Sequence, residues 1–202
     1  MNLTSLDYLE SLDENHIADE RKIQLDGLVD SIKNQISKSG FSKVVFICTH
    51  NSRRSTLAQV LCESLANLLD LNDITFYSGG TESTAFNYRM VKALQAKGFV
   101  LEEIEKGENP KYILQSDSQK SSIYFSKKYD EEPNPTKDFI AVIVCDHAAD
   151  NCPIVHGADA IVPLTYIDPK NADDSENEPE VYLKKVDEIG GEMKYMMKRV
   201  LL

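Results

Sequence analysis

The sequence lacks any long hydrophobic run: nowhere do about 18 apolar residues follow one another, as a membrane-spanning helix requires. The segment Met1–Asp7 also has neither the basic start nor the apolar stretch of a secretory signal. Cysteine is scarce, with four in 202 residues, which is too few for the disulfide scaffold of a secreted protein. We therefore expect a cytoplasmic protein, with no membrane partner, that uses some of its cysteines for chemistry.

Positive charge is also in short supply. The chain has 22 lysines and arginines against 33 acidic residues, a net charge of −11 and an isoelectric point near 4.8. Nucleic acids and anionic membrane surfaces need a basic face, so neither is expected as a partner. An anionic substrate would have to be held by a local field. The length and the 42% hydrophobic content predict one ordinary globular core.

One segment combines a nucleophile with an anion-binding geometry. The apolar run Val44–Ile47 is followed by Cys48 and then by Arg54 and Ser55, in a C-x5-R-S loop (residues 48–55) ahead of a predicted helix. Backbone N–H groups and the positive end of the helix dipole attract an anion there and favour the thiolate of Cys48. The planar fork of Arg54 can hold two oxygens of a tetrahedral anion, and Ser55 can bond the thiolate. The alternative is a buried strand-end cysteine beside a solvated arginine.

Hydrophobic periodicity predicts strands alternating with helices, and hence an α/β fold with a doubly wound parallel sheet flanked by helices. Helices are predicted at 17–39, 53–69, 87–97 and 180–201, and strands at 43–48, 74–78, 139–145 and 160–164. Residues 1–40 are interpreted as an N-terminal helical extension to a domain at 41–202. Within that domain, the polar residues 105–137 are predicted to be an insertion with one short strand near Ile123–Phe125. Gly190-Gly191 is a predicted kink in the last helix, and the acidic run at 173–178 a solvated loop.

A second pair of cysteines follows the strand at 139–145. Cys145 and Cys152 are seven residues apart, which is about 10.5 Å along a helix. A disulfide needs Cα atoms within about 7 Å, so bonding them would require a helical segment to unwind, as in a redox switch. The spacing is atypical of zinc sites, and two incidental thiols are the alternative. Cys62, in the predicted helix at 53–69, is interpreted as apolar filler.

An aspartate follows the last predicted strand. Asp168-Pro169 lies on a loop at the carboxyl edge of the sheet, where Asp168 could protonate a leaving oxygen. An Asp-Pro pair is also a common turn signal.

Together these segments resemble the low-molecular-weight protein tyrosine phosphatase superfamily, and within it the thioredoxin-coupled arsenate reductases, over about residues 43–201. The resemblance implies that Cys48 attacks the oxyanion, that Arg54 and the loop stabilise it, and that Asp168 is the acid. It further implies that Cys145 attacks Cys48 and that Cys152 then forms a disulfide with Cys145, which a thioredoxin-like donor reduces. The implied oxyanion-binding residues are Thr49, His50, Asn51, Ser52, Arg53, Arg54 and Ser55.

Three positions depart from the family pattern. His50 stands where glycine is usual, Arg53 where another cysteine is common, and Gln59 replaces an acidic residue that helps to bind potassium in some reductases. No metal and no cofactor are therefore predicted. The function predicted is arsenate reduction. The alternatives are a phosphatase acting on phosphotyrosine or another phosphate ester, with Phe86 and Tyr88 as ring walls, and an oxyanion sensor without turnover.

Overall fold

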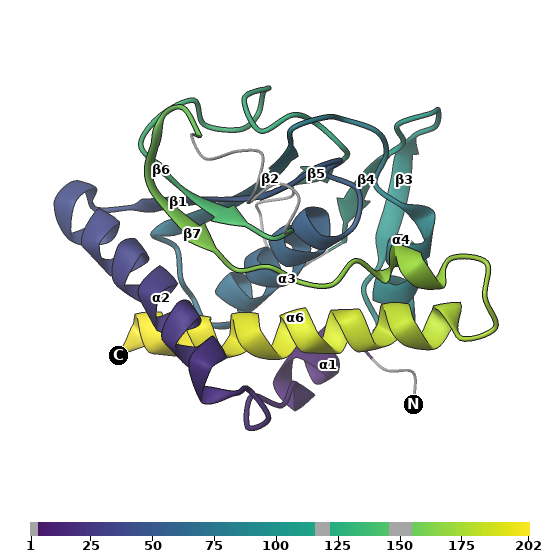
Figure 1. The fold of residues 1–202 in the computed structure, drawn as a ribbon, viewed down its shortest axis with the longest axis horizontal. Coiled ribbons are helices and arrows are strands. Elements are labelled where there is room, and N and C mark those ends of the chain that lie inside the picture. Colours follow the sequence, from purple (N-terminus) through teal and green to yellow (C-terminus); the bar gives the residue numbers. More distant parts are fainter. Residues whose placement is uncertain (1–3, 116–121, 146–154) are drawn as a thin grey trace.

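The computed structural model describes residues 4–115, 122–145 and 155–202. Its centre is a parallel four-stranded sheet with the order β2-β1-β6-β7 (Figure 1). The strands are β1 (Ser42–Cys48), β2 (Ile74–Gly80), β6 (Phe139–Ile143) and β7 (Ala158–Pro163). β6 and nearly all of β1 are buried, as expected of continuous apolar strands at the middle of a parallel sheet. The predicted α/β fold with a parallel sheet is confirmed.

The long helices pack together beside this sheet. α2 (Asp19–Ser39) contacts β1 and β7, α3 (Arg54–Leu68) contacts β1 and β2, and both contact α6 (Glu178–Leu201), which runs along the base of Figure 1. α4 (Tyr88–Ala96) packs on α6, and the short α1 (Ser5–Ser11) precedes α2. In the described ranges, no helix is both long enough and apolar enough to cross a bilayer.

The N-terminal helices share the core of the sheet. Leu25, Leu28 and Ile32 of α2 are 0% exposed and belong to the same hydrophobic cluster as Phe46 of β1. The helix ends where predicted, at Gly40, whose φ of 80° suits a residue without a side chain. The division of the chain at residue 40 stays a prediction.

A second sheet forms where mainly a polar insertion was expected. β3 (Leu101–Glu105), β4 (Lys111–Leu114) and β5 (Ile123–Tyr124) pair antiparallel in that order. The short strand predicted near Ile123 is confirmed, whereas β3 and β4 were missed. β3 is exposed at all but its first residue, so its sequence has no buried alternation to reveal a strand.

The sheet order places one crevice next to β1. The chain passes from β1 through α3 to β2 on one side, while β6 lies on the other side of β1. Ligands of such sheets bind at this switch point, beyond the carboxyl ends of the strands. Cys48 ends β1 and Cys145 follows β6, so the topology brings two of the predicted site segments to the same edge.

Candidate active site

The thiol of Cys48 lies inside the C-x5-R-S loop. Its Sγ accepts a hydrogen bond from the backbone N of Asn51 at 3.1 Å and lies 3.1 Å from Ser55 Oγ. Asn51 has a φ of 45°, a left-handed conformation that asparagine tolerates better than most residues. Its side-chain Nδ2 donates to Ser55 Oγ at 2.9 Å. The loop therefore turns one backbone donor and one hydroxyl toward the thiol, at the N-terminus of α3.

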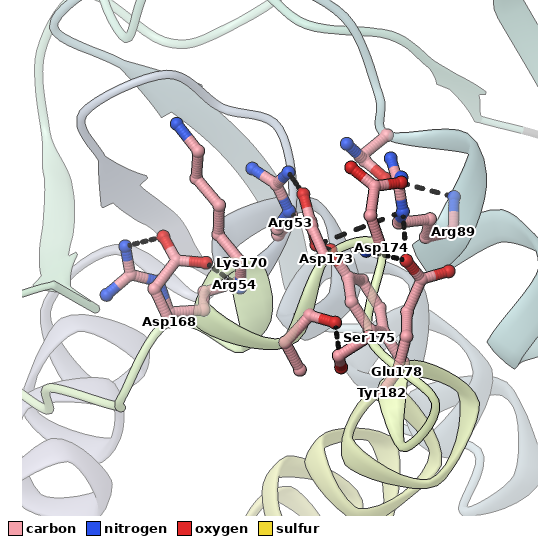
Figure 2. Close-up of polar contacts among 12 residues, drawn as sticks. Arg53, Arg54, Arg89, Asp168, Lys170, Asp173, Asp174, Ser175, Glu178 and Tyr182 are labelled. Carbon is pink, nitrogen blue, oxygen red and sulfur yellow. Dashed lines mark hydrogen bonds and ion pairs between the residues drawn. The ribbon is translucent and has the colours of Figure 1, made fainter.

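Arg54 of the loop and Asp168 form an ion pair (Figure 2). Arg54 Nη2 donates to Asp168 Oδ2 at 2.5 Å, and Arg54 Nη1 donates to the backbone oxygen of Tyr166 at 2.8 Å. Asp168 Oδ1 also accepts from the backbone N of Lys170, at the start of the 3-10 helix η1 (Pro169–Ala172). Arg54 Nε is buried and has no hydrogen-bond partner among the described residues. Nε is thus the guanidinium nitrogen that bonds no described protein group.

Arg53 points away from this pair, toward the start of α6 (Figure 2). Its guanidinium donates to Tyr182 OH at 2.7 Å and to Asp173 Oδ2 at 2.8 Å. Only the backbone of Arg53 is thus left to serve as the predicted oxyanion ligand.

The acidic run at 173–178 forms the predicted loop, exposed at residues 174–177, and it also binds two arginines. Arg89 of α4 donates to Asp174 at 2.5 Å and to Glu178 at 2.7 Å, and Asp173 holds Arg53. The carboxylates lie where they neutralise two arginines that come from distant segments, and the sequence of the run alone does not show those partners.

Residues 126–128 support the loop from behind, a role that the sequence did not indicate. Ser126 Oγ donates to the backbone oxygen of His50 at 2.8 Å, and the backbone N of Lys127 donates to Asn51 Oδ1 at 2.9 Å. The backbone of Gly80 bonds both Lys127 and Tyr129, which joins this segment to the end of β2. The predicted insertion thus helps to shape the site.

The cysteines differ in their surroundings. Cys145 Sγ lies 3.5 Å from Thr49 Oγ1, beside the loop, whereas Cys152 lies outside the described residues. Cys62 is fully buried in α3, and burial raises its pKa well above that of an ordinary thiol. The interpretation of Cys62 as core filler agrees with this position.

The departures from the family pattern leave the loop intact. The exposed imidazole of His50 lies 3.7 Å from Glu82, and the left-handed position in the loop is Asn51 rather than its neighbour. Gln59 accepts from Ser78 Oγ at 2.6 Å and donates to Glu63 at 2.9 Å, so both ends of its amide are engaged. No group of three metal-ligating side chains occurs in the part of the chain that the structure describes.

A pocket of about 380 Å³ adjoins the loop at Ser52. Tyr88, which is 50% exposed, and Glu108 line it. Phe86 lines it too, but its ring is buried and packs edge-on against Tyr112. Of the two predicted ring walls, Tyr88 is the accessible one.

Fold and loop together define a parallel α/β protein with a cysteine in a C-x5-R-S loop at the carboxyl edge of its sheet. Comparison with known proteins shows which proteins share these features. The family model described as low molecular weight phosphotyrosine protein phosphatase matches residues 43–117. These residues include the C-x5-R-S loop, so the match agrees with the resemblance that the motifs predicted. Closeness to arsenate reductases is not shown by these matches.

Solved structures share the fold at low sequence identity. A YwlE mutant from Bacillus subtilis is 17% identical, with a TM-score of 0.53 over 80% of this chain and 99% of that one. A low molecular weight protein tyrosine phosphatase from T. tengcongensis is 18% identical, with a TM-score of 0.50 over 78% and 98%. Another from Bacillus subtilis is 16% identical, with a TM-score of 0.52 over 79% and 97%. A search of curated proteins finds no significant match.

Proposed function

We propose that the protein hydrolyses phosphate monoesters through a thiophosphate intermediate on Cys48. The observation that carries the proposal is the 2.5 Å contact between Arg54 and Asp168, which lies beside the thiol-bearing loop. An acid and an oxyanion-binding guanidinium are thereby held together where a leaving group would depart. The family match at residues 43–117 supports the same chemistry.

The steps follow from the positions of the groups. The Cys48 thiolate attacks phosphorus while Arg54 and the loop amides bind the nonbridging oxygens. The bond to the ester oxygen breaks, and Asp168 gives that oxygen its proton. A water molecule then attacks phosphorus, Asp168 takes a proton from it, and the S–P bond breaks to release phosphate and the thiolate. The pocket beside Ser52 is large enough to receive the leaving group.

Arsenate reduction, the function predicted from the sequence, is the second candidate. The observation that favours it is the position of Cys145, whose sulfur lies against Thr49 in the C-x5-R-S loop. In that reaction Cys145 would attack the sulfur of a Cys48–arsenate adduct. The S–As bond would break with its electron pair going to arsenic, arsenite would leave, and a Cys48–Cys145 disulfide would form. Cys152 would then attack Cys145 and release the Cys48 thiolate, and a thioredoxin-like dithiol would reduce the resulting Cys145–Cys152 disulfide.

Two assays on one preparation of the protein distinguish ester hydrolysis from arsenate reduction. We expect hydrolysis of p-nitrophenyl phosphate that Cys48→Ser abolishes, that Asp168→Asn slows about 100-fold or more, and that Cys62→Ala leaves within about twofold. Arsenate with thioredoxin, thioredoxin reductase and NADPH tests the second function. Absence of hydrolysis, or hydrolysis that survives Cys48→Ser, would contradict the phosphatase proposal.

Cys145→Ser decides the role of the second thiol. A phosphatase should retain most of its hydrolysis in this variant. If the wild-type protein reduces arsenate and the variant does not, while its ester hydrolysis is retained, the reductase assignment holds. Equal reduction by both would show that Cys145 is idle in that reaction.

A further inference from the structure

Tyr166 connects the candidate active site with the N-terminal helices. Its backbone oxygen accepts from Arg54 Nη1 at 2.8 Å. Its hydroxyl, at the other end of the residue, donates to Glu192 Oε2 of α6 at 2.6 Å. The residue as a whole is 3% exposed. One residue therefore contacts the oxyanion-binding arginine with its backbone and the helical layer with its side chain.

Arg21 of α2 holds the other side of this contact. Its Nε donates to Glu192 Oε1 at 2.9 Å, and its guanidinium lies over the Tyr166 ring, 4.5 Å from the ring centroid. Burial, followed by the nearby charge of Glu192, raises the pKa of Tyr166 well above its usual value. The hydroxyl therefore stays protonated and remains a donor to Glu192. Arg21, Glu192 and Tyr166 form a closed triangle of charge-assisted contacts.

The location of this triangle matters for the site because Asp168 is only two positions after Tyr166 in the chain. A shift of Tyr166 as a whole, backbone included, would displace the carbonyl that accepts from Arg54 and would move Asp168 with it. A displacement of about 1 Å in a catalytic constellation can cost about 100-fold in rate.

We propose that Arg21 and Glu192 are positioning residues, which fix Tyr166 and thereby aim Arg54 at the bound oxyanion. In this proposal the N-terminal segment contributes Arg21 to the support of the site, in addition to the apolar residues that it contributes to the core. This inference rests on the proposed function for its rate measurements, but its binding measurement does not need turnover.

The chain contains a matched control for a merely structural bridge. Arg199 of α6 pairs with Asp26 of α2 at 3.0 Å and stacks on the Tyr195 ring at 3.8 Å. Its ion pair joins the same two helices, and it too stacks on a tyrosine ring, but its side chain is 42% exposed against 17% for Arg21. No hydrogen bond in the described structure leads from Arg199 to Tyr166 or Arg54.

The experiment compares Arg21→Met with Arg199→Met at a temperature where circular dichroism shows both to be folded. We expect Arg21→Met to lower kcat/KM for p-nitrophenyl phosphate at least tenfold and to raise the dissociation constant of inorganic phosphate at least threefold. Arg199→Met should change neither by more than twofold. Arg21→Lys should recover part of the loss, because it returns the charge without the planar fork.

Tyr166→Phe tests the same connection without removing a charge. It should lower kcat/KM in the same direction as Arg21→Met. The kcat/KM of the double variant should lie no more than about twofold below that of the less active single variant, because both changes break the same connection. If Arg21→Met fails to fold, Tyr166→Phe and its phosphate affinity decide the proposal.

Two results would overturn it: losses in Arg21→Met that match those in Arg199→Met, or losses in Tyr166→Phe and Arg21→Met that multiply in the double variant. If the wild-type protein binds phosphate but hydrolyses no ester, the proposed function fails instead. The ratio of phosphate dissociation constants between the two arginine variants then still decides the role of Arg21.

Discussion

At the scale of single residues, the C-x5-R-S loop depends on groups that distant segments supply. Asn51 bonds Ser55 within the loop and accepts from the backbone of Lys127 outside it. Gly80 lies so close behind the loop that a Cβ there would come within 2.6 Å of the backbone oxygen of Thr49. The loop therefore has the space and the donors that hold Cys48 only when β2 and residues 126–128 are in place.

Lys127, whose backbone supports the loop, has an ionisable side chain that is buried in the folded protein. Its side chain is 2% exposed, and its Nζ has no hydrogen-bond partner in the described ranges. The Phe125 ring centroid lies 4.8 Å from the Nζ, and the charge of Glu63 favours the ammonium form. Burial lowers the pKa of Lys127 to about 8, and Glu63 opposes this shift. The charged form of Lys127 is thus disfavoured by folding.

We predict that Lys127 makes stability rise with pH between about 8 and 10. In this window the unfolded chain keeps the lysine proton while the folded chain loses it, so the unfolding free energy increases with pH. The contribution should be on the order of 1 kcal/mol between pH 8 and 9.5. Urea unfolding of the wild type and of Lys127→Met at both pH values measures it, since other titrating groups cancel in the difference. A difference that does not change with pH would contradict the assignment.

At the scale of elements, α6 shows why two glycines can stand inside a helix. It runs unbroken from Glu178 to Leu201, so Gly190-Gly191, where a kink was predicted, do not interrupt the helix. A Cβ on Gly190 would lie 2.8 Å from a methyl group of Leu12, and one on Gly191 would lie 2.5 Å from the backbone oxygen of Asp13. The glycines allow the segment after α1 to approach the helix closely.

We predict opposite effects for two glycine-to-alanine changes in helix interiors. Gly27 of α2 has nothing within 4 Å of its missing Cβ, so Gly27→Ala should stabilise the fold by about 0.5–1 kcal/mol through helix propensity. Gly191→Ala should destabilise it by about 1–3 kcal/mol, because the backbone of Asp13 must move. Chemical denaturation of both variants checks this. If Gly191→Ala instead stabilised the fold, the backbone around Asp13 could move away from the new methyl group at little cost in free energy.

At the scale of the whole molecule, one hydrophobic cluster runs from the N-terminal helices through the sheet to α6. Tyr8 and Leu9 of α1, Leu28 of α2 and Met193 of α6 are all members of it. Fully burying a side chain such as leucine contributes about 1.5–3 kcal/mol, and several of them together equal the total stability of an ordinary domain, about 5–15 kcal/mol.

We predict that residues 41–202 do not fold cooperatively without residues 1–40. Removal of α2 would expose the apolar faces of β1, β7 and α6 that it covers. Thermal melts followed by circular dichroism test this, with Ile23→Ala as the control. Ile23 lies on the same helix but is 71% exposed, so its truncation should shift the unfolding free energy by less than about 0.5 kcal/mol. A cooperative melt of residues 41–202 near that of the full chain would show that the first 40 residues are an independent addition.

Short-range chemistry was sufficient to predict the alternation of helices and strands, the parallel sheet and the C-x5-R-S loop. An apolar run, a glycine stop or a cysteine six residues before an arginine acts on neighbours in the chain, so each can be recognised without a partner. The end of α2 at Gly40 and the start of α3 at Arg54 fall within one residue of their predicted positions for this reason.

The partners of the site residues depended on folding. Arg54 meets Tyr166 and Asp168 across more than 110 residues, Asn51 meets Lys127 across 76, and Arg89 meets Glu178 across 89. Such contacts leave no periodic signal in the sequence, because each is set by where the sheet order and the helix packing place two segments. The proposed nucleophile, Cys48, could therefore be found from the residues around it. The groups proposed to support the site, from Ser126 behind the loop to Arg21 on the N-terminal helix, became visible only once those segments had been brought together.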